Sequence, residues 1–140
     1  MKISTKGRYA LRLMMDVAMH GGAGFVSLKD AAARQQISMK YLEQIAGTLS
    51  KAGMLRSGRG AQGGYSLSRP PEQYTVGSIL RLTEGNLAPV ACLEPEENPC
   101  ERCGACATLD FWTGLYATVN AYVDRFTLAD LVRAEREKNG

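Results

Sequence analysis

The chain has 140 residues, 45% of them hydrophobic and 22% charged, a composition typical of one compact domain or of a small domain with an appendage. Its apolar stretch over residues 10–19 is too short to span a bilayer and contains Arg12 and Asp16, which excludes a membrane-spanning helix there. The N-terminus lacks a signal-peptide pattern. We therefore expect a cytoplasmic protein with no membrane partner.

The charge is distributed unevenly along the chain. Residues 1–69 carry 11 Lys and Arg against 3 Asp and Glu, a net charge of +8. Residues 70–140 carry 6 against 11, a net charge of −5, and the two values sum to the overall +3. Because Lys and Arg displace counterions from phosphates, the basic half favours a nucleic-acid partner. The alternative is a solvated surface of uneven sign.

Three helices are predicted in the basic half. Apolar side chains recur at one-turn spacing over residues 5–20, which predicts the first helix. Ser27 and Asp30 form a Ser-x-x-Asp capping pattern, which predicts that a second short helix begins there. Ser38 is expected to cap a third helix over residues 39–52. Two short helices joined by a tight turn are typical of a helix-turn-helix. A generic small helical domain with a polar face is the alternative.

The outward side of the third helix carries groups that suit the major groove. Lys40 can meet a phosphate, Glu43 can accept a hydrogen bond from a cytosine amino group, and Gln44 can pair with adenine. These side chains predict that this helix contacts bases in double-stranded DNA.

A glycine-rich segment over residues 58–64 follows, between strand-like runs at 54–57 and 65–68, and predicts a β-hairpin wing. Its glycines allow close approach to the phosphate backbone or the minor groove, where Arg59 would insert. A nucleotide-binding loop fits poorly, because no Walker Lys-Ser/Thr follows the glycines. The predicted DNA-binding set is Lys6, Arg8, Ser38, Lys40, Tyr41, Glu43, Gln44, Arg59 and Gln62.

A long helix is predicted over residues 107–125, after a short helix at 75–84. Its apolar residues step by 3, 4, 3 and 4 in a coiled-coil-type seam, formed by Trp112, Leu115, Val119, Tyr122 and Phe126. We expect this seam to pack against a second copy of the chain in a homodimer, because a small winged helix cannot cover so much apolar surface. The alternative is a core helix that packs on the first helix. A last helix is expected over residues 128–137.

All four cysteines lie in residues 92–106, CLEPEENPCERCGAC, which we call the cysteine loop; they are Cys92, Cys100, Cys103 and Cys106. Cytoplasmic thiols are normally reduced, so this concentration indicates a metal or redox site. The C-x2-C-x2-C run is closer to the run of bacterial ferredoxins than to the paired C-x2-C motifs of zinc sites. An iron–sulfur cluster is favoured, with zinc and a thiol/disulfide switch as alternatives. We expect no enzyme, because the sequence offers no general base or substrate pocket.

These elements predict a mainly α fold with a small β-hairpin wing. We expect a winged helix-turn-helix over residues 1–70, a linker with a short helix over 71–91, the cysteine loop, and a dimerisation helix with a C-terminal helix over 107–140.

Several motifs closely resemble those of the Rrf-type winged-helix transcription regulators, in particular the IscR-like and NsrR-like members. They are KGRYAL (6–11), DVA (16–18), ISMKYLEQI (37–45), RG-x-x-GGY (59–65), TVGSIL (75–80) and FTLADLV (126–132). The resemblance implies a homodimeric DNA-binding repressor or activator. IscR-like members use a Ser, a Glu and a wing Arg where this chain has Lys40, Glu43 and Arg59. Lys40 departs from that pattern, so we expect a different preferred operator.

The resemblance also implies that Cys92, Cys100 and Cys106 hold an iron–sulfur cluster, with [2Fe-2S] favoured over [4Fe-4S]. The fourth ligand of IscR, a histidine, is replaced here by Leu109. Cys103 is the main candidate for the fourth ligand, and an acidic residue near the N-terminus of a partner subunit is a weaker one. The resulting hypothesis is a cluster-dependent transcription regulator, and the alternative is a zinc-stabilised or thiol-switched regulator without a cluster.

Overall fold

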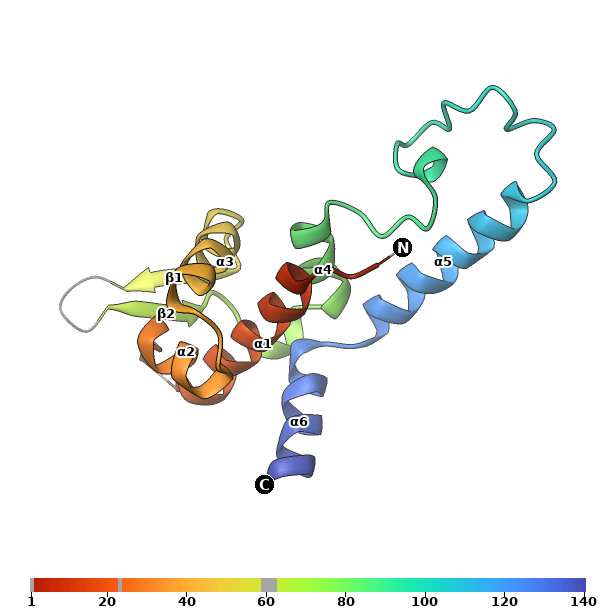
Figure 1. The fold of residues 1–140 in the computed structure, drawn as a ribbon. Helices are drawn as coiled ribbons and strands as arrows, with labels where there is room; N and C mark the ends of the chain where they lie inside the picture. The colour runs from red at the N-terminus through yellow and green to blue at the C-terminus, as the bar shows by residue number, and fades with distance from the viewer. Residues whose placement is uncertain (1, 23, 59–62) are drawn as a thin grey trace.

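The computed structural model describes residues 2–22, 24–58 and 63–140, which form a mainly α fold with one β-hairpin (Figure 1). This result confirms the predicted fold class. The helices are Thr5–His20 (α1), Leu28–Gln35 (α2), Met39–Lys51 (α3), Val76–Glu84 (α4), Leu109–Arg125 (α5) and Leu128–Asn139 (α6), with 3-10 turns at Pro71–Gln73 (η1) and Ala91–Leu93 (η2) and strands at Leu55–Gly58 (β1) and Gly64–Leu67 (β2).

Hydroxyl side chains cap most of these helices, and the predicted caps at Ser27 and Ser38 are confirmed. The Ser27 hydroxyl accepts a hydrogen bond from the Asp30 N–H at 3.1 Å, and Ser38 accepts one from Tyr41 N–H at 3.2 Å. Such caps satisfy N–H groups that have no partner within the helix. Gln36 has φ 56° at the end of α2, and this left-handed residue makes the tight turn into α3.

The central element is α1, which contacts α2, α3, α4, α6 and β2. Its apolar stripe is fully or almost fully buried and consists of Ala10, Leu13, Met14 and Val17. This stripe packs with Leu42, Ile45 and Leu49 of α3 in one hydrophobic core. Burial of so many large side chains against a single helix holds α2, α3 and α4 in fixed positions around it.

A buried carboxylate joins α1 to α2. Asp16 is 1% exposed and accepts hydrogen bonds from Arg34 Nη2 at 2.7 Å, Arg34 Nε at 3.0 Å and Gln35 Nε2 at 2.9 Å. Burial opposes ionisation of Asp16, but the hydrogen bonds from Arg34 and Gln35 outweigh it and leave its pKa below the ordinary value. Gln35 also accepts a hydrogen bond from Arg12 Nε at 3.1 Å, so the network covers the whole α1–α2 contact.

The hairpin is antiparallel and pairs Leu55 with Leu67 and Gly58 with Gly64. Both strands begin and end one residue away from the predicted bounds. Val26 pairs with the outer side of β2 as a single-residue β-bridge. Its N–H donates to the Tyr65 carbonyl and its carbonyl accepts from the Tyr65 N–H, at 2.8 Å each. The wing is therefore tied to the segment that enters α2.

The chain after the hairpin is anchored by Tyr74, which is fully buried. Its hydroxyl donates to the Met54 carbonyl at 2.7 Å and accepts from the Ser68 N–H at 3.0 Å. From here α4 packs on α1, whereas α5 extends away from the body as an arm (Figure 1). No helix in the described ranges is long and apolar enough to cross a membrane.

Replacement of the buried acid provides a test of the α1–α2 contact. Asp16→Asn should lower the free energy of unfolding by about 2 kcal/mol at neutral pH, because Asn lacks the negative charge and places an NH2 donor where one acceptor oxygen faced Arg34 and Gln35. A carboxylate whose pKa is lower in the folded protein than in the unfolded chain stabilises the fold at every pH above its unfolded-state pKa. This contribution to stability is lost as the pH falls through the folded-state pKa. The deficit of the variant should therefore shrink as the pH falls below the ordinary Asp pKa of about 3.9 and through the lower pKa of folded Asp16.

Urea unfolding of both proteins measures this difference. Arg133→Gln, which removes an exposed ion pair within α6, is the matched control and should change stability by less than about 0.5 kcal/mol. A deficit that stays constant down to acid pH would contradict an ionised Asp16 in the folded protein.

Candidate nucleic-acid interface and cysteine loop

One side of α3 is exposed and polar. Lys40, Glu43 and Gln44 are exposed, whereas Leu42 and Ile45 on the opposite side lie in the core. Neither Lys40 nor Glu43 forms an ion pair with any residue that the structure describes. Both charges are therefore available to a partner molecule.

The other predicted DNA contacts occupy different positions. Ser38 is exposed but its hydroxyl caps α3, and the half-buried Tyr41 packs edge-to-face on Tyr9 with 5.7 Å between ring centroids. Both residues thus also serve the fold. Lys6 is half-buried and Arg8 exposed in the first turn of α1.

The tip of the wing includes the predicted contacts Arg59 and Gln62, which lie outside the described residues. The base of the wing is described and depends on Gly64, whose φ is +136°. A Cβ at this position would collide with the Val26 carbonyl. Only glycine suits such a backbone this close to a neighbouring chain segment.

Two exposed apolar side chains near this surface are absent from the predicted set. Met39 is 41% exposed in the first turn of α3, although it lies one turn before the buried Leu42. Phe25 is 49% exposed and lies against Gly58, where a Cβ would come within 2.9 Å of its ring. Helical periodicity gives no sign that these side chains are exposed.

The cysteine loop lies at the far end of α5, on the opposite side of the molecule from the hairpin (Figure 1). Its four thiols are half-buried and free of disulfides. The Asn98 side chain accepts from Cys100 N–H at 2.9 Å, and Cys103 N–H donates to the Cys100 carbonyl at 3.1 Å. Cys92 lines a hollow with Tyr116 of α5, so the loop folds back along that helix.

Cys106 lies just before the first turn of α5. Its sulfur is 3.4 Å from the Thr108 hydroxyl oxygen. The Thr108 hydroxyl, together with the backbone N–H groups of Thr108 and Leu109, lowers the pKa of the Cys106 thiol. A helix N-terminus favours a thiolate, the form in which cysteine binds metals.

The four thiols are suitable ligands for a metal ion or an iron–sulfur cluster, but the loop does not bring them close enough together to bind one. No three His, Cys, Asp or Glu side chains within residues 2–22, 24–58 and 63–140 are grouped to hold a metal ion. Asp16 is the one acidic residue among residues 1–29, and its engagement with Arg34 leaves no acidic ligand near the N-terminus. His20 lies at the far end of α1, so Cys103 is the nearest fourth donor in the sequence.

The α5 helix has one apolar side that packs on α4 and another that is exposed. None of its 17 residues is buried. The inner side packs against Val76, Leu80 and Leu87, and it consists of Tyr116, Val119 and Val123, followed by Phe126. The outer side includes Tyr122, 57% exposed, and Phe111, 65% exposed. Phe111 is missing from the predicted dimerisation set. Two members of that set, Val119 and Phe126, pack against Val76, Leu80 and Leu87 of the same chain. Two others, Trp112 and Leu115, are half-buried.

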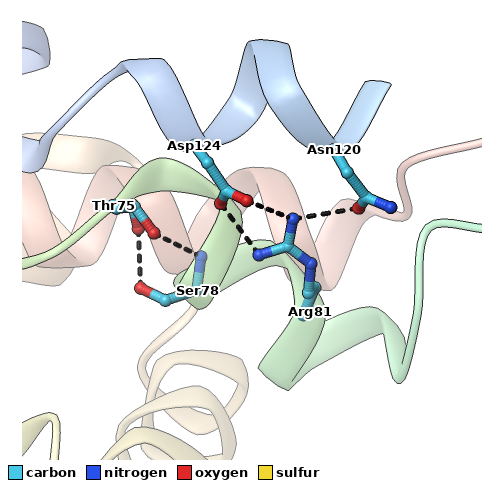
Figure 2. Close-up of polar contacts among 5 residues, drawn as sticks. All are labelled: Thr75, Ser78, Arg81, Asn120 and Asp124. Carbon is cyan, nitrogen blue, oxygen red and sulfur yellow. Dashed lines mark hydrogen bonds and ion pairs between the residues drawn. The ribbon is translucent and has the colours of Figure 1, made fainter. Parts of the chain in front are cut away.

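A cluster of polar side chains fixes α5 to α4, as Figure 2 shows. Arg81 donates to both Asp124 carboxylate oxygens, at 2.9 and 2.8 Å, and to Asn120 Oδ1 at 2.9 Å. The hydrogen bond from Arg81 lowers the pKa of Asp124, so this contact stays charged around neutral pH. We call Arg81, Asn120 and Asp124 the Arg81 clamp.

A family model and a relative of known sequence both match almost the whole chain. A family model named Rrf2, described as an iron-dependent transcriptional regulator, matches residues 3–134. Protein rrf2 of Nitratidesulfovibrio vulgaris is 44% identical over 134 residues, which cover 95% of this chain and 88% of that protein.

Two solved structures are also similar. CymR, described as the global cysteine regulator of B. subtilis, has a TM-score of 0.78 and 40% identity, with 96% of this chain and 98% of that one covered. T. potens IscR has a TM-score of 0.79 and 38% identity, with 100% and 92% covered. Other IscR and CymR relatives are named as transcriptional regulators, which agrees with the expectation that the chain is not an enzyme.

A pair of glycine substitutions tests the base of the wing. Gly64→Ala should destabilise the protein by about 2 kcal/mol, because alanine is strained at this φ and its methyl meets the Val26 carbonyl. Gly47→Ala, in α3 with open space around it, should stabilise by about 0.5–1 kcal/mol. Thermal unfolding measures both, and an unchanged midpoint for Gly64→Ala would refute the close contact at the wing base.

Proposed function

The chain belongs to the Rrf2 family of transcriptional regulators, and we propose that it is a dimeric, sequence-specific DNA-binding regulator controlled by an iron–sulfur cluster in the cysteine loop. The observation that carries this proposal is the set of four free thiols directly before an exposed apolar helix. The functional units are a winged helix over 1–70, a linker over 71–91, the cysteine loop, and the C-terminal helices over 107–140.

The DNA-binding surface consists of the exposed side of α3 together with the wing. Glu43 accepts a hydrogen bond from a cytosine amino group, Gln44 contacts adenine, and Lys40 meets a phosphate. Arg59 extends the contact into the minor groove. The free charges of Lys40 and Glu43 and the net charge of +8 over residues 1–69 support this assignment.

The dimer interface is the outer side of α5. Phe111 and Tyr122 are exposed, and Trp112 and Leu115 are half-buried, on a helix that has no buried residue. Two-fold symmetry would pair this side with itself and present two copies of α3 to two half-sites of an operator.

Cys92, Cys100 and Cys106 are the proposed cluster ligands, with Cys103 as the fourth. An iron–sulfur cluster would supply a centre that responds to oxidation and to iron supply. The resemblance of the sequence motifs to IscR-like regulators favours [2Fe-2S], and [4Fe-4S] is the alternative. The lowered pKa of Cys106 makes its thiolate easier to form than that of an ordinary cysteine. The conformation of the loop must change for the four thiols to converge, because no three of them are grouped within the described residues. The protein's own response is therefore a rearrangement of residues 92–106 at the N-terminal end of α5.

A second candidate function is regulation by the thiols themselves. The chain is similar to CymR as well as to IscR, so the second candidate is a regulator without a cluster, in which the cysteines form a disulfide or bind zinc. Metal content separates the two candidates.

The first test of the proposal uses anaerobically purified protein. The wild type should be brown, with iron and sulfide, and each of Cys92→Ser, Cys100→Ser and Cys106→Ser should lose most of the iron and the visible absorption, because the cluster loses a thiolate ligand. Cys103→Ser decides the fourth ligand: loss of iron assigns it there. Colourless wild-type protein with stoichiometric zinc, or with no metal, would overturn the cluster in favour of the second candidate.

The second test separates base contacts from phosphate contacts. Glu43→Ala should relax discrimination at one base-pair position by about 1–3 kcal/mol, measured with duplexes selected from a random pool. Lys40→Ala should weaken binding to all duplexes alike and reduce the salt dependence by about one phosphate contact. Glu72→Ala, an exposed acid in η1, is the control. Unchanged specificity for Glu43→Ala would exclude Glu43 as a base contact.

A further inference from the structure

We infer that the Arg81 clamp sets the angle at which α5 leaves the winged helix, and thereby selects the spacing of the two half-sites that the dimer can bind. This inference rests on the proposed dimerisation through α5. It assigns a positioning role to Arg81, Asn120 and Asp124, which belong neither to the proposed DNA contacts nor to the cysteine loop.

The Arg81 side of the clamp is fixed to the DNA-binding unit. Arg81 lies on α4, whose Ile79 is fully buried in the core formed with α1 and α3. The start of α4 is held by Thr75, which accepts from the Ser78 N–H at 3.0 Å (Figure 2). A displacement of Arg81 would therefore require the core around α1 to move as well.

The other side of the clamp provides a second attachment point for α5. The first point lies at its C-terminal end, where the Phe126 carbonyl accepts from Val76 N–H at 2.8 Å and Leu128 N–H donates to the Tyr74 carbonyl at 2.9 Å. A helix held there alone could swing about that point, so the direction of α5 depends on its apolar contacts with α4, made by Val119 and Val123, and on the clamp. Arg81 binds Asn120 and Asp124, so the second point lies up to about 9 Å along the helix at 1.5 Å per residue.

The geometry amplifies small displacements. Leu109 lies 17 residues before Phe126, about 25 Å along α5, so a shift of about 1 Å at Asn120 becomes about 3 Å at the start of the helix. In a dimer joined along α5, the same rotation would occur in both copies. The distance and twist between the two α3 helices therefore depend on the clamp.

Close packing beside the clamp supports the same assignment. A Cβ at Gly77 of α4 would lie 2.9 Å from Val123 Cγ2, would come within 2.8 Å of Arg81 Nη1 and would contact the Asp124 carboxylate. The two helices thus approach each other as closely as a glycine permits at the point where Arg81 reaches across. The Arg81 and Asp124 side chains are 34% and 44% exposed, and ion pairs this exposed add little to the stability of the fold. The contact therefore serves to orient α5 on α4 more than to stabilise the protein.

The test measures affinity for duplexes in which two copies of a selected half-site are separated by zero to several inserted base pairs. Wild-type protein should bind one spacing best, because both recognition helices must face the same side of DNA. Arg81→Met keeps the apolar stem but removes every donor, and it should reduce the preference for the optimal spacing by about tenfold. Gly77→Ala changes no charge and should shift or flatten the same preference while α4 remains helical.

Two controls distinguish positioning from stability. Arg133→Met removes the exposed α6 pair and should leave the spacing profile unchanged. Arg81→Lys, which restores one charged donor, should recover part of the preference. A contact that only stabilises the fold would weaken binding equally at every spacing.

The possible failures are separable. If wild-type protein shows no dependence on half-site spacing, the dimeric regulator proposed above is wrong. If wild-type protein has a sharp optimum and both Arg81→Met and Gly77→Ala keep it with folded protein, the assignment to the clamp alone is overturned.

Discussion

The attachment of α5 to α4 is the constraint on which the functional organisation depends. No residue of α5 is buried in the chain, so the helix keeps its direction through the Arg81 clamp, the Phe126–Val76 hydrogen bond and a few half-buried apolar contacts. Everything on the other side of α4 is built around the buried stripe of α1. The molecule is therefore a rigid DNA-binding unit joined to a projecting arm.

This division explains how a cysteine loop can act on DNA binding without touching it. Within one chain the loop and the hairpin lie at opposite ends (Figure 1), so the proposed signal must pass through α5 or through a partner subunit. Ordering the loop would fix backbone that is now held by short-range turns, such as the one between Cys100 and Cys103. The free energy of ligand binding would offset that loss of conformational entropy, which makes the loop conformation dependent on its ligand.

Much of the fold was predictable because its signals are local. Ser27 and Ser38 are caps within one turn of the helices they start, and helical periodicity identified the buried stripe of α1. Non-local features escaped prediction. Arg81 and Asp124 are 43 positions apart, and the burial of Tyr74 depends on the Met54 carbonyl. The cysteine spacing indicated ligand chemistry, but spacing alone cannot show whether the thiols converge, because a loop rich in proline and acidic residues has no regular backbone geometry.

The central claim is that the state of the cysteine loop controls DNA binding. Its most direct test is the affinity of anaerobically purified protein for one selected operator duplex, measured before and after removal of iron and sulfide from the same preparation. The account predicts that affinity or sequence preference differs by about fivefold or more between the two forms, within the range of ordinary allosteric coupling. Equal affinity and equal sequence preference for both forms would contradict it.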